Sequence, residues 1–152
     1  MTAKLDPFAA APAQMKAWLD FSLATNKTLE ASLVRLVEIR ASQINGCANC
    51  LNMHTADARA GGESEQRIYL LSAWREAPCY SARERAALGW TDALTRLSEG
   101  HGQEAAYEAL AAEFTKEEQV LLTLVINVIN GWNRIAVGFG LFADRAPARA
   151  VA

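Results

Sequence analysis

The spacing of apolar residues is the feature that most constrains this chain, because they recur at intervals of three and four along nearly its whole length, as in Leu29, Leu33, Leu36 and Val37. This spacing places apolar side chains on one face of an α-helix. No segment alternates apolar and polar residues between turn residues, as a half-buried strand would. A chain of 152 residues, 51% of them hydrophobic, is long enough to bury a core of its own. The sequence therefore predicts a single-domain, all-α helical bundle.

Residues that start and stop helices divide this pattern into about six to seven helices. Ser81–Glu84 and Thr115–Glu118 both have the form of a capping box, in which two side chains bind free N–H groups at the start of a helix. Asn45–Gly46, Gly61–Gly62 and Pro78 fall where the apolar spacing breaks, and such residues end helices. The expected helices cover residues 12–25, 29–44, 47–60, 64–76, 82–98, 103–113 and 116–142.

The same pattern divides the chain into three regions. Residues 1–28 are expected to form an N-terminal helix and arm, and residues 29–143 the helical core. Residues 144–152 are rich in Ala, Arg and Pro, which predicts a flexible tail. No linker or internal repeat interrupts the core, so we expect it to fold as one unit.

The charge balance argues against nucleic acid as a partner. Fifteen Lys and Arg residues oppose seventeen Asp and Glu residues, and the sequence pI is about 5.7. Proteins that bind nucleic acid draw much of their affinity from an excess of basic residues that neutralise phosphates. We therefore expect no nucleic-acid partner.

Signals for membrane insertion and export are weak. The most apolar stretch, Val120–Phe142, is interrupted by Asn127, Asn130, Asn133 and Arg134, which favours a buried helix over a membrane span. The first residues lack both the apolar core of a secretory signal and the Arg and Ser bias of a transit peptide. We therefore expect a cytoplasmic protein without a membrane partner.

Cys47 and Cys50 form a Cys-x-x-Cys motif directly after Asn45–Gly46, a turn that ends one expected helix and begins the next. Both cysteines should occupy the first helical turn, where unpaired N–H groups and the helix dipole stabilise a thiolate. A spacing of three brings the two sulfurs to one face, close enough for a disulfide. His54 follows Cys50 by four residues, so its imidazole should lie beside the second thiol and exchange a proton with it.

These features predict a reactive thiol pair. A helix start and a neighbouring imidazole both lower the pKa of a thiol and so raise the fraction of thiolate at neutral pH. The thiolate attacks a peroxide oxygen to give a sulfenic acid, and a second thiol three residues away converts that acid to a disulfide before irreversible oxidation. An outside dithiol must then reduce the disulfide.

Two alternatives to redox chemistry rank lower. Cys47 and Cys50 could be buried packing thiols that lie three residues apart by chance. They could also bind structural zinc together with His54, but the usual second pair of ligands some 12 to 20 residues onward is missing. Cys79 or His101 would then have to supply the fourth ligand. We therefore expect neither a metal nor another cofactor.

The Gly-Cys-x-x-Cys-x-x-x-His core, within the segment Arg-Ala-Ser-Gln-Ile-Asn-Gly-Cys that ends at Cys47, resembles the alkyl hydroperoxidase D-like branch of the carboxymuconolactone decarboxylase family. The likeness extends roughly from Leu29 to Phe142, and the set of motifs is specific when taken together. The further matching segments are Met53–Thr55, Ala58–Arg59, Trp74–Glu76, Arg83–Leu88 and Ile129–Arg134.

The resemblance implies an all-α fold, homotrimers or homohexamers, and an oxidoreductase that uses a small organic peroxide or hydrogen peroxide as acceptor. It also implies a dithiol reductant such as a lipoylated protein. Two other functions stay open. One is a cofactor-independent lyase of the carboxymuconolactone decarboxylase type, which needs no thiol pair. The other is a non-enzymatic redox sensor or structural module, in which the pair oxidises without turnover.

The resemblance also implies roles for the two thiols. By position, Cys50 is the attacking thiol, Cys47 the resolving thiol and His54 the relay histidine. Helix physics alone favours the opposite order, because Cys47 lies nearer the helix start and should be the more exposed thiol. We adopt the order of the family, because only Cys50 has a histidine four residues further along.

The sequence departs from the family at two positions. Arg35 stands where the family often has a glutamate, and Asn49 stands where well-studied members have a second histidine. We hypothesise that Glu38, three residues after Arg35 and on the same helix face, replaces the missing glutamate and orients His54. The alternative is that Glu38 and Arg35 only form an exposed ion pair.

Glu84 is the remaining acidic candidate. As the third residue after Ser81 it is explained by the capping box alone, and its functional interpretation is a carboxylate near the thiols. Asn130, Asn133 and Arg134 are expected to satisfy buried polar groups rather than to touch substrate. Two further reactive side chains are expected to play no part, Cys79 as a bystander in a loop and His101 as a solvated residue between glycines.

Overall fold

The computed structural model describes residues 3–100 and 102–142, and within these ranges it contains helices and turns but no strand. The prediction of an all-α, single-domain fold is confirmed. All seven expected helices are present, and a short one precedes them. The α-helices are α1 (Pro7–Ala10), α2 (Pro12–Thr25), α3 (Ala31–Asn45), α4 (Ala48–Ala60), α5 (Glu65–Leu70), α6 (Ala82–Thr95), α7 (Gln103–Glu113) and α8 (Lys116–Phe139), and the 3₁₀ helices η1 (Leu71–Ala73) and η2 (Leu97–Glu99) follow α5 and α6.

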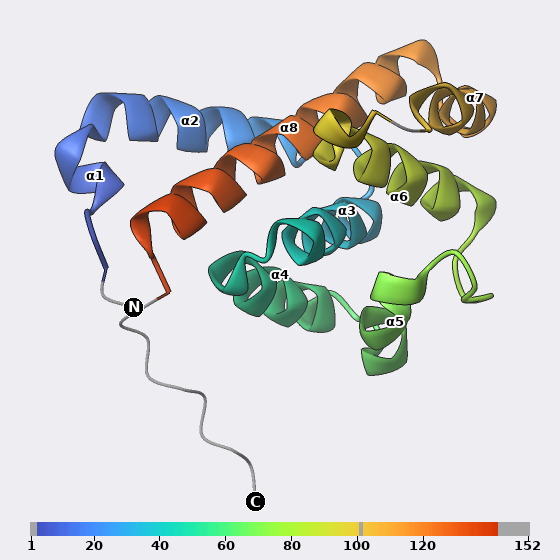
Figure 1. Cartoon of the computed structure of the whole chain (residues 1–152), viewed down its shortest axis with the longest axis horizontal. Helices are drawn as coiled ribbons and strands as arrows, with labels where there is room; N and C mark the ends of the chain where they lie inside the picture. The colour runs from blue at the N-terminus through green and yellow to red at the C-terminus, as the bar shows by residue number, and fades with distance from the viewer. Residues whose placement is uncertain (1–2, 101, 143–152) are drawn as a thin grey trace, which may run out of the picture.

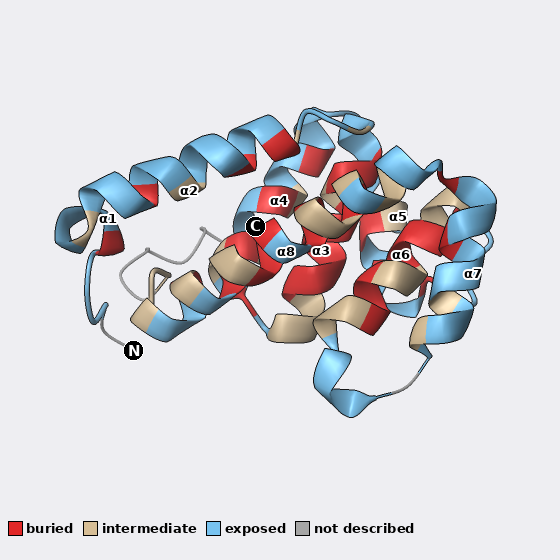
Figure 2. Ribbon diagram, turned by 90° about the horizontal axis from the view of Figure 1, so that it is seen from above, coloured by how far each residue is buried: buried red, intermediate tan, exposed pale blue. Residues whose placement is uncertain are grey.

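Helix α3 lies at the centre of the bundle, with α4, α6 and α8 packed around it (Figure 1). The long helix α8 crosses the molecule, and α7 packs against it and α6. Helix α2 lies along the other part of α8, at one edge of the bundle. Figure 2 shows the buried residues gathered on α3, α6 and α8, whereas most of α2 is exposed. The bundle is therefore centred on α3, whose last turn leads into the thiol pair.

The apolar core follows the helical spacing in the sequence. One part joins α3, α6, α7 and α8, and the other joins α3 to α4, α5, η1 and α6. The side chains in these clusters are almost completely buried, which is the main favourable term in folding. The first part includes Val34, Val37, Leu110, Leu122 and Ile126, and the second includes Leu36, Ile39, Ile68, Leu71 and Leu88.

Both predicted capping boxes are present. The Ser81 side chain accepts the N–H of Glu84 while the Glu84 carboxylate accepts the N–H of Ser81, and Thr115 and Glu118 do the same at α8. At the end of α3, Gly46 has a φ of 65°, in the left-handed region that residues with a Cβ rarely adopt. This turn lets α4 start directly after α3.

The expected helix over 64–76 is shorter than predicted. Helix α5 ends at Leu70 and continues only as η1, after which the chain turns. The Arg85 guanidinium on α6 binds the carbonyl oxygens of Trp74 at 2.9 Å and Ala77 at 2.8 Å. These carbonyls are satisfied by a distant side chain, so the backbone there need not continue as a helix.

The other boundaries differ by a few residues. Helix α6, expected over 82–98, ends at Thr95. Helix α8, expected over 116–142, ends at Phe139, with Gly140 as its cap. The extra helix α1 starts because Asp6 accepts the N–H groups of Phe8 and Ala9. The predicted tail over 144–152 lies outside the described residues, and the proposed boundaries of the three regions stay predictions.

Helix α2 lies against α8 because of a close contact at Gly131. A Cβ built at Gly131 would lie 2.6 Å from Cζ2 of Trp18, a separation that real Cβ atoms do not show. Trp132, the next residue on α8, donates its indole N–H to Oγ of Ser22 at 2.9 Å. The absence of a side chain at position 131 therefore sets how closely α2 packs on α8.

Helix α8 is long and apolar enough to cross a membrane by length and composition alone. Its buried side consists of core residues such as Leu122, Ile126 and Ile129. Asn130 and Asn133 on the same side are hydrogen-bonded to other helices. The predicted buried helix is thus observed in the bundle.

Candidate active site

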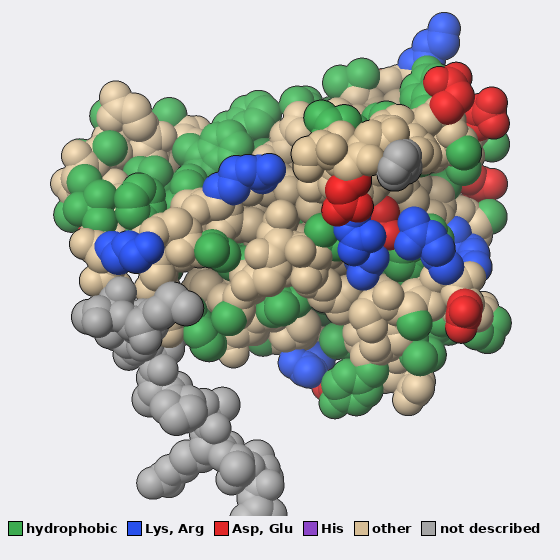
Figure 3. All heavy atoms as spheres, in the orientation of Figure 1, with side chains coloured by type: hydrophobic (Ala, Val, Ile, Leu, Met, Phe, Trp, Pro, Cys, Tyr) green, Lys and Arg blue, Asp and Glu red, His purple; other side chains and the backbone are tan. Residues whose placement is uncertain are grey.

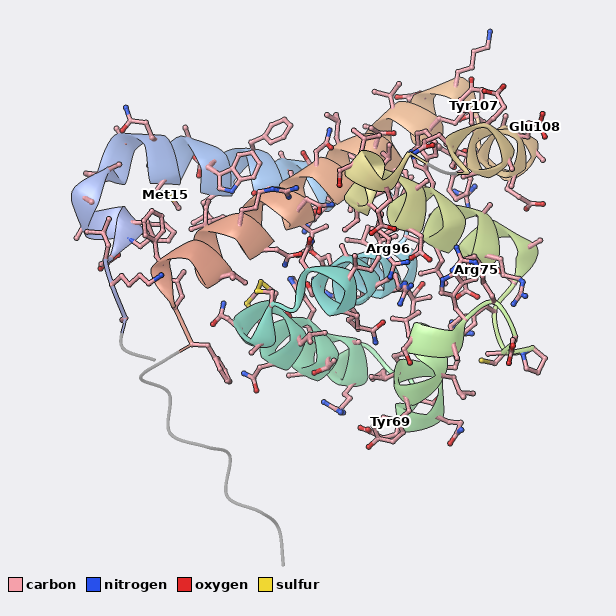
Figure 4. All side chains as sticks on the ribbon, in the orientation of Figure 1. Met15, Tyr69, Arg75, Arg96, Tyr107 and Glu108 are labelled. Carbon is pink, nitrogen blue, oxygen red and sulfur yellow. A yellow bond between two sulfur atoms is a disulfide. The ribbon has the colours of Figure 1, made fainter. Side chains whose placement is uncertain are left out.

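Cys47 and Cys50 are joined by a disulfide at the start of α4, drawn as a yellow bond in Figure 4. Their Cα atoms lie 5.4 Å apart, the usual separation for a disulfide. Cys47 is the N-cap residue of α4, and its sulfur accepts the N–H of Cys50 at 3.3 Å. The Gly46 turn therefore places both sulfurs where the free N–H groups of the helix stabilise negative charge.

Both cysteines are buried. Cys47 is 1% and Cys50 2% exposed, so the expectation that Cys47 is the more exposed thiol is not met. The pair packs with Ala41 of α3 and with Ile129 and Ala136 of α8, and the partly buried Leu141 adjoins this cluster. The disulfide thus lies between α3, α4 and the end of α8, and burial does not distinguish the roles of the two cysteines.

His54 lies on the same buried side of α4 as Cys50, one turn further along. Its Nδ1 is 3.1 Å from Oε2 of Glu38 on α3, and both side chains are less than one-tenth exposed. Nδ1 and Oε2 are thus within the distance of an ion pair, but they do not form a well-aligned hydrogen bond. The structure therefore places Glu38 against His54, which lies one turn beyond Cys50 on α4.

Glu38 has two further partners. Arg35 donates from Nη1 to Oε2 at 2.9 Å, and Asn26 donates from Nδ2 to Oε1 at 2.6 Å. The Arg35–Glu38 ion pair expected from the sequence exists, but Glu38 is buried in it, with 3% of its side chain exposed. Burial alone would raise the pKa of Glu38, but His54 and Arg35 outweigh it, so the pKa lies below its ordinary value and the carboxylate is charged.

Glu84 is held by other groups. Its Oε2 accepts the N–H of Ser81 at 2.8 Å, and its Oε1 accepts Nη2 of Arg67 at 2.5 Å. These contacts lie in the first turn of α6, at the opposite side of the bundle from the disulfide (Figures 1 and 4). The structure does not bring Glu84 to the thiols, because the capping box and the Arg67 ion pair fix its carboxylate.

A network of amides ties the turn before the thiol pair to α8. Asn45 donates from Nδ2 to Oδ1 of Asn130 at 2.9 Å and to Oδ1 of Asn133 at 2.8 Å. Asn133 in turn donates to Oγ of Ser42 at 3.0 Å. Asn130 and Asn133 thus satisfy buried polar groups, as expected, and they fix the residue that precedes Gly46.

Arg134 is exposed and donates from Nη1 to the carbonyl oxygen of Asn130 at 2.8 Å. Cys79 is free and exposed, in the loop before α6. His101 lies outside the described residues. Neither Arg134 nor Cys79 is part of the cluster formed by the cysteines, His54 and Glu38.

The sequence interpretation missed a buried ion pair between α3 and α6. Arg40 on α3 binds Asp92 on α6 through Nε at 2.6 Å and Nη2 at 3.0 Å, and Arg75 adds a third contact at 2.6 Å. Burial would raise the pKa of Asp92, but the two arginines lower it below its ordinary value. No spacing rule connects residues 40 and 92, so only a buried position for Arg40 on the apolar face could have indicated such a partner.

The best-formed hollow does not coincide with the thiol pair. A hollow of about 690 Å³ between α6 and α7 is lined by small residues, with Arg75 and Arg96, labelled in Figure 4, among its charged ones. It does not include the cysteines or His54. Within residues 3–100 and 102–142 no group of three or more His, Cys, Asp or Glu side chains could hold a metal ion. Because His101 lies outside these residues, a zinc site that includes it stays untested.

Comparisons with known proteins agree with this geometry. The carboxymuconolactone decarboxylase family model matches residues 12–93. The uncharacterised protein YdfG of Bacillus subtilis (strain 168) is 39% identical over 141 residues, which cover 92% of this chain and 96% of YdfG.

Two solved structures are also similar. One is a protein of unknown function from Agrobacterium tumefaciens, described as a candidate antioxidant defence protein AhpD, with 42% identity, a TM-score of 0.89, and coverage of 97% of this chain and all of that one. The other is an uncharacterised peroxidase-related protein from Silicibacter sp. TM1040, with 25% identity, a TM-score of 0.76, and coverage of 88% and 71%.

The fold and the site together define an all-helical protein with a Cys-x-x-Cys disulfide at a helix start and a buried histidine–carboxylate pair beside it. The chain belongs to the carboxymuconolactone decarboxylase family, and its structure is that of the AhpD-like members.

Proposed function

We propose that this protein is a thiol peroxidase that reduces a small organic hydroperoxide or hydrogen peroxide and is reset by an external dithiol. The observation that carries the proposal is that His54 lies on the buried side of α4, which the Cys47–Cys50 disulfide begins, and contacts Glu38 of α3. A pair that can alternate between thiols and a disulfide, next to a group that can move protons, has the parts that peroxide reduction needs. The AhpD-like and peroxidase-related descriptions of the similar structures support the proposal.

Each reactive group has a role in the oxidative half of the cycle. His54 accepts the proton of the Cys50 thiol, and Glu38 holds the other side of the imidazole. The Cys50 thiolate attacks a peroxide oxygen, so that an S–O bond forms and the O–O bond breaks. His54 returns the proton to the leaving alkoxide, which departs as an alcohol. The Cys47 sulfur then attacks the sulfur of the Cys50 sulfenic acid, so that the S–S bond forms and the S–O bond breaks. The leaving hydroxide takes up the proton of the Cys47 thiol and departs as water.

The reductive half of the cycle needs an outside partner. A dithiol such as a lipoylated protein gives two electrons and two protons to the disulfide through a mixed disulfide, and leaves oxidised. The N–H of Cys50 that points at the sulfur of Cys47 stabilises the Cys47 thiolate when it is released. The proposal places this cycle in the cytoplasm, where dithiol reductants are available.

A homo-oligomer, a trimer or a hexamer, is part of the proposal. Helices α1 and α2 expose large apolar side chains on one side of the molecule, and Figure 3 shows hydrophobic atoms gathered there. Exposed apolar patches of this kind often form interfaces between subunits. The exposed residues are Phe8, Leu19, Phe21 and Leu23.

The test is to measure consumption of an organic hydroperoxide with excess dihydrolipoamide. We expect one dihydrolipoamide to be oxidised for each hydroperoxide, with both Cys47 and Cys50 required and Cys79→Ser equal to the parent protein. Reversible oxidation of the pair without turnover would favour the redox sensor instead. Conversion of a carboxymuconolactone by a protein that lacks both cysteines would favour the lyase.

A further inference from the structure

Asn26 belongs to the predicted N-terminal arm, yet it touches the site. It follows α2 as the C-cap residue, and its Nδ2 lies 2.6 Å from Oε1 of Glu38. The other carboxylate oxygen, Oε2, is shared by Arg35 on α3 and His54 on α4. Three separate segments of the chain thus hold the two oxygens of one buried carboxylate.

The orientation of the Asn26 amide follows from this contact. An ionised carboxylate only accepts hydrogen bonds, so the NH₂ group of Asn26 must face Glu38. The amide oxygen then points into the protein, where it is buried without a hydrogen-bond partner among the described residues. A buried unpaired oxygen costs folding free energy. The hydrogen bond from Asn26 therefore fixes the position of Glu38 at the expense of some stability.

We propose that Asn26 is a positioning residue that holds Oε1 of Glu38, so that Oε2 faces Nδ1 of His54 and the proton of the neutral imidazole stays on Nδ1. Nε2 is then the free acceptor for the proton of the Cys50 thiol. The inference rests on the proposed peroxidase function only for its effect on rate. Its effect on the tautomer of His54 rests on the 3.1 Å contact between Nδ1 and Oε2 of Glu38, whatever reaction the protein catalyses.

The charged groups around Glu38 show why a second anchor matters. Arg35, which binds Oε2, is 4.0 Å from Asp57 on α4, so a second carboxylate competes for the guanidinium. Without the bond to Asn26, Glu38 could turn with Arg35 and leave Nδ1 of His54. Asn26 opposes that rotation from the other side of the carboxylate.

The inference also gives the N-terminal arm a part in the site. Helix α2 is fixed on α8 by the contact of Trp18 with Gly131 and by the bond from Trp132 to Ser22. Asn26 follows directly after this helix. The position of α2 on α8 therefore sets the position of the amide on Glu38.

The test compares Asn26→Leu and Asn26→Asp with the matched control Thr28→Val. Thr28→Val removes a hydrogen bond of the same connection, from Thr28 Oγ1 to the carbonyl oxygen of Thr25 at 2.7 Å, without touching Glu38. The chain has only two histidines, so ¹⁵N spectra of the full chain on a His101→Gln background report His54 alone. We expect Nδ1–H in the parent protein and in Thr28→Val, and a mixture of tautomers in Asn26→Leu.

Asn26→Asp has nearly the same shape but places a second carboxylate against Glu38. Two carboxylates at this distance share a proton, which raises the pKa of Glu38. We therefore expect the reaction of Cys50 with hydroperoxide to slow at a higher pH than in the parent protein as the solution is made more acidic. At neutral pH its rate should fall by about tenfold or more. Thr28→Val should keep the pH profile of the parent protein.

The outcomes separate the two proposals. If the tautomer in Asn26→Leu is that of the parent protein while circular dichroism shows both folded, Asn26 does not position Glu38. If Asn26→Leu does not fold, an unchanged pH profile and tautomer in the isosteric Asn26→Asp would overturn the inference in the same way. If the parent protein consumes no hydroperoxide, the proposed function fails, and the tautomer still decides the role of Asn26.

Discussion

Arg40 and Asp92 form a buried, two-bond ion pair that joins α3 to α6 across 52 residues of sequence. Arg40 lies in the same helix as Glu38, and its guanidinium binds both oxygens of the Asp92 carboxylate. Removing one partner of such a pair leaves the other charge buried and unpaired. A single substitution in the pair should therefore lower the stability of the fold strongly.

We expect Asp92→Asn to lower the free energy of unfolding by about 3–5 kcal/mol, measured by urea denaturation. The matched control is Asp20→Asn, which breaks the pair between Lys16 and Asp20 on α2, whose side chains are 74% and 57% exposed. That change should cost no more than about 0.5 kcal/mol. Equal losses in the two variants would show that burial does not strengthen the Arg40–Asp92 pair.

Stability should depend on pH through Glu38 and Asp92. Both have a pKa below the ordinary value, 4.5 for Glu38 and 3.8 for Asp92, because positively charged partners outweigh their burial. A lowered pKa in the folded state gives stability that is present above the unfolded pKa and is lost as the pH falls through the folded pKa.

Urea midpoints should therefore be level from about pH 6 to pH 7 and should fall steadily below about pH 4.5. The combined variant Glu38→Gln, Asp92→Asn should start lower and show a flatter fall. A parent protein that becomes more stable as the pH drops from 5 to 3 would contradict the direction of both shifts.

Mild peroxide treatment should remove two thiols of the three. Cys47 and Cys50 are joined at the start of α4, whereas Cys79 is free and exposed in the loop before α6. Thiol titration of the denatured protein should thus find one thiol after treatment and three after reduction. Retention of stoichiometric zinc together with three unreacted thiols would instead support the metal-binding interpretation.

The two cysteines should differ when replaced one at a time. Cys50→Ser should abolish the reaction with hydroperoxide, whereas Cys47→Ser should allow one attack per chain and leave a sulfenic acid that a dimedone probe captures. The reason is that His54 shares the buried side of α4 with Cys50 and lies seven residues from Cys47. A sulfenic acid trapped in Cys50→Ser and absent from Cys47→Ser would reverse the roles.

The two acidic candidates should separate cleanly. Glu38→Gln should slow the reaction with hydroperoxide by about 10²–10⁴-fold, because a neutral amide cannot stabilise the charged imidazole. Glu84→Gln should keep the rate of the parent protein and lose stability, since it weakens the bond to Arg67 while the amide oxygen can still accept the N–H of Ser81. A slow Glu84→Gln beside a normal Glu38→Gln would assign the role to Glu84.

The parts of the fold that depend on local sequence could be predicted. Both capping boxes and the turn at Gly46 depend on residues within a few positions of one another, so their sequence patterns were sufficient. The contact of Glu38 with His54 could be predicted for the same reason. Glu38 lies three residues after Arg35, His54 lies four residues after Cys50, and one tight turn joins α3 to α4.

The parts that depend on distant residues could not be predicted. Arg40 meets Asp92, Asn26 meets Glu38 and Arg85 binds the carbonyls after η1 only because helices pack in a particular arrangement. No periodicity in a single sequence specifies which polar side chain a buried charge will meet. The burial of Cys47 is of this kind, because α8 covers a helix start that would otherwise be exposed.

The missing side chain at position 131 has a consequence for how this sequence can vary. A methyl group there would collide with Trp18, so that the indole ring or α2 itself would have to move. A displacement of α2 would reach the site, because the amide of Asn26 moves with the end of α2 while Glu38 stays on α3. Gly131→Ala changes a helix that contributes no reacting group, yet a displaced α2 would slow the proton transfer by His54. Natural selection for fast turnover would then preserve a glycine that touches neither the thiols nor His54.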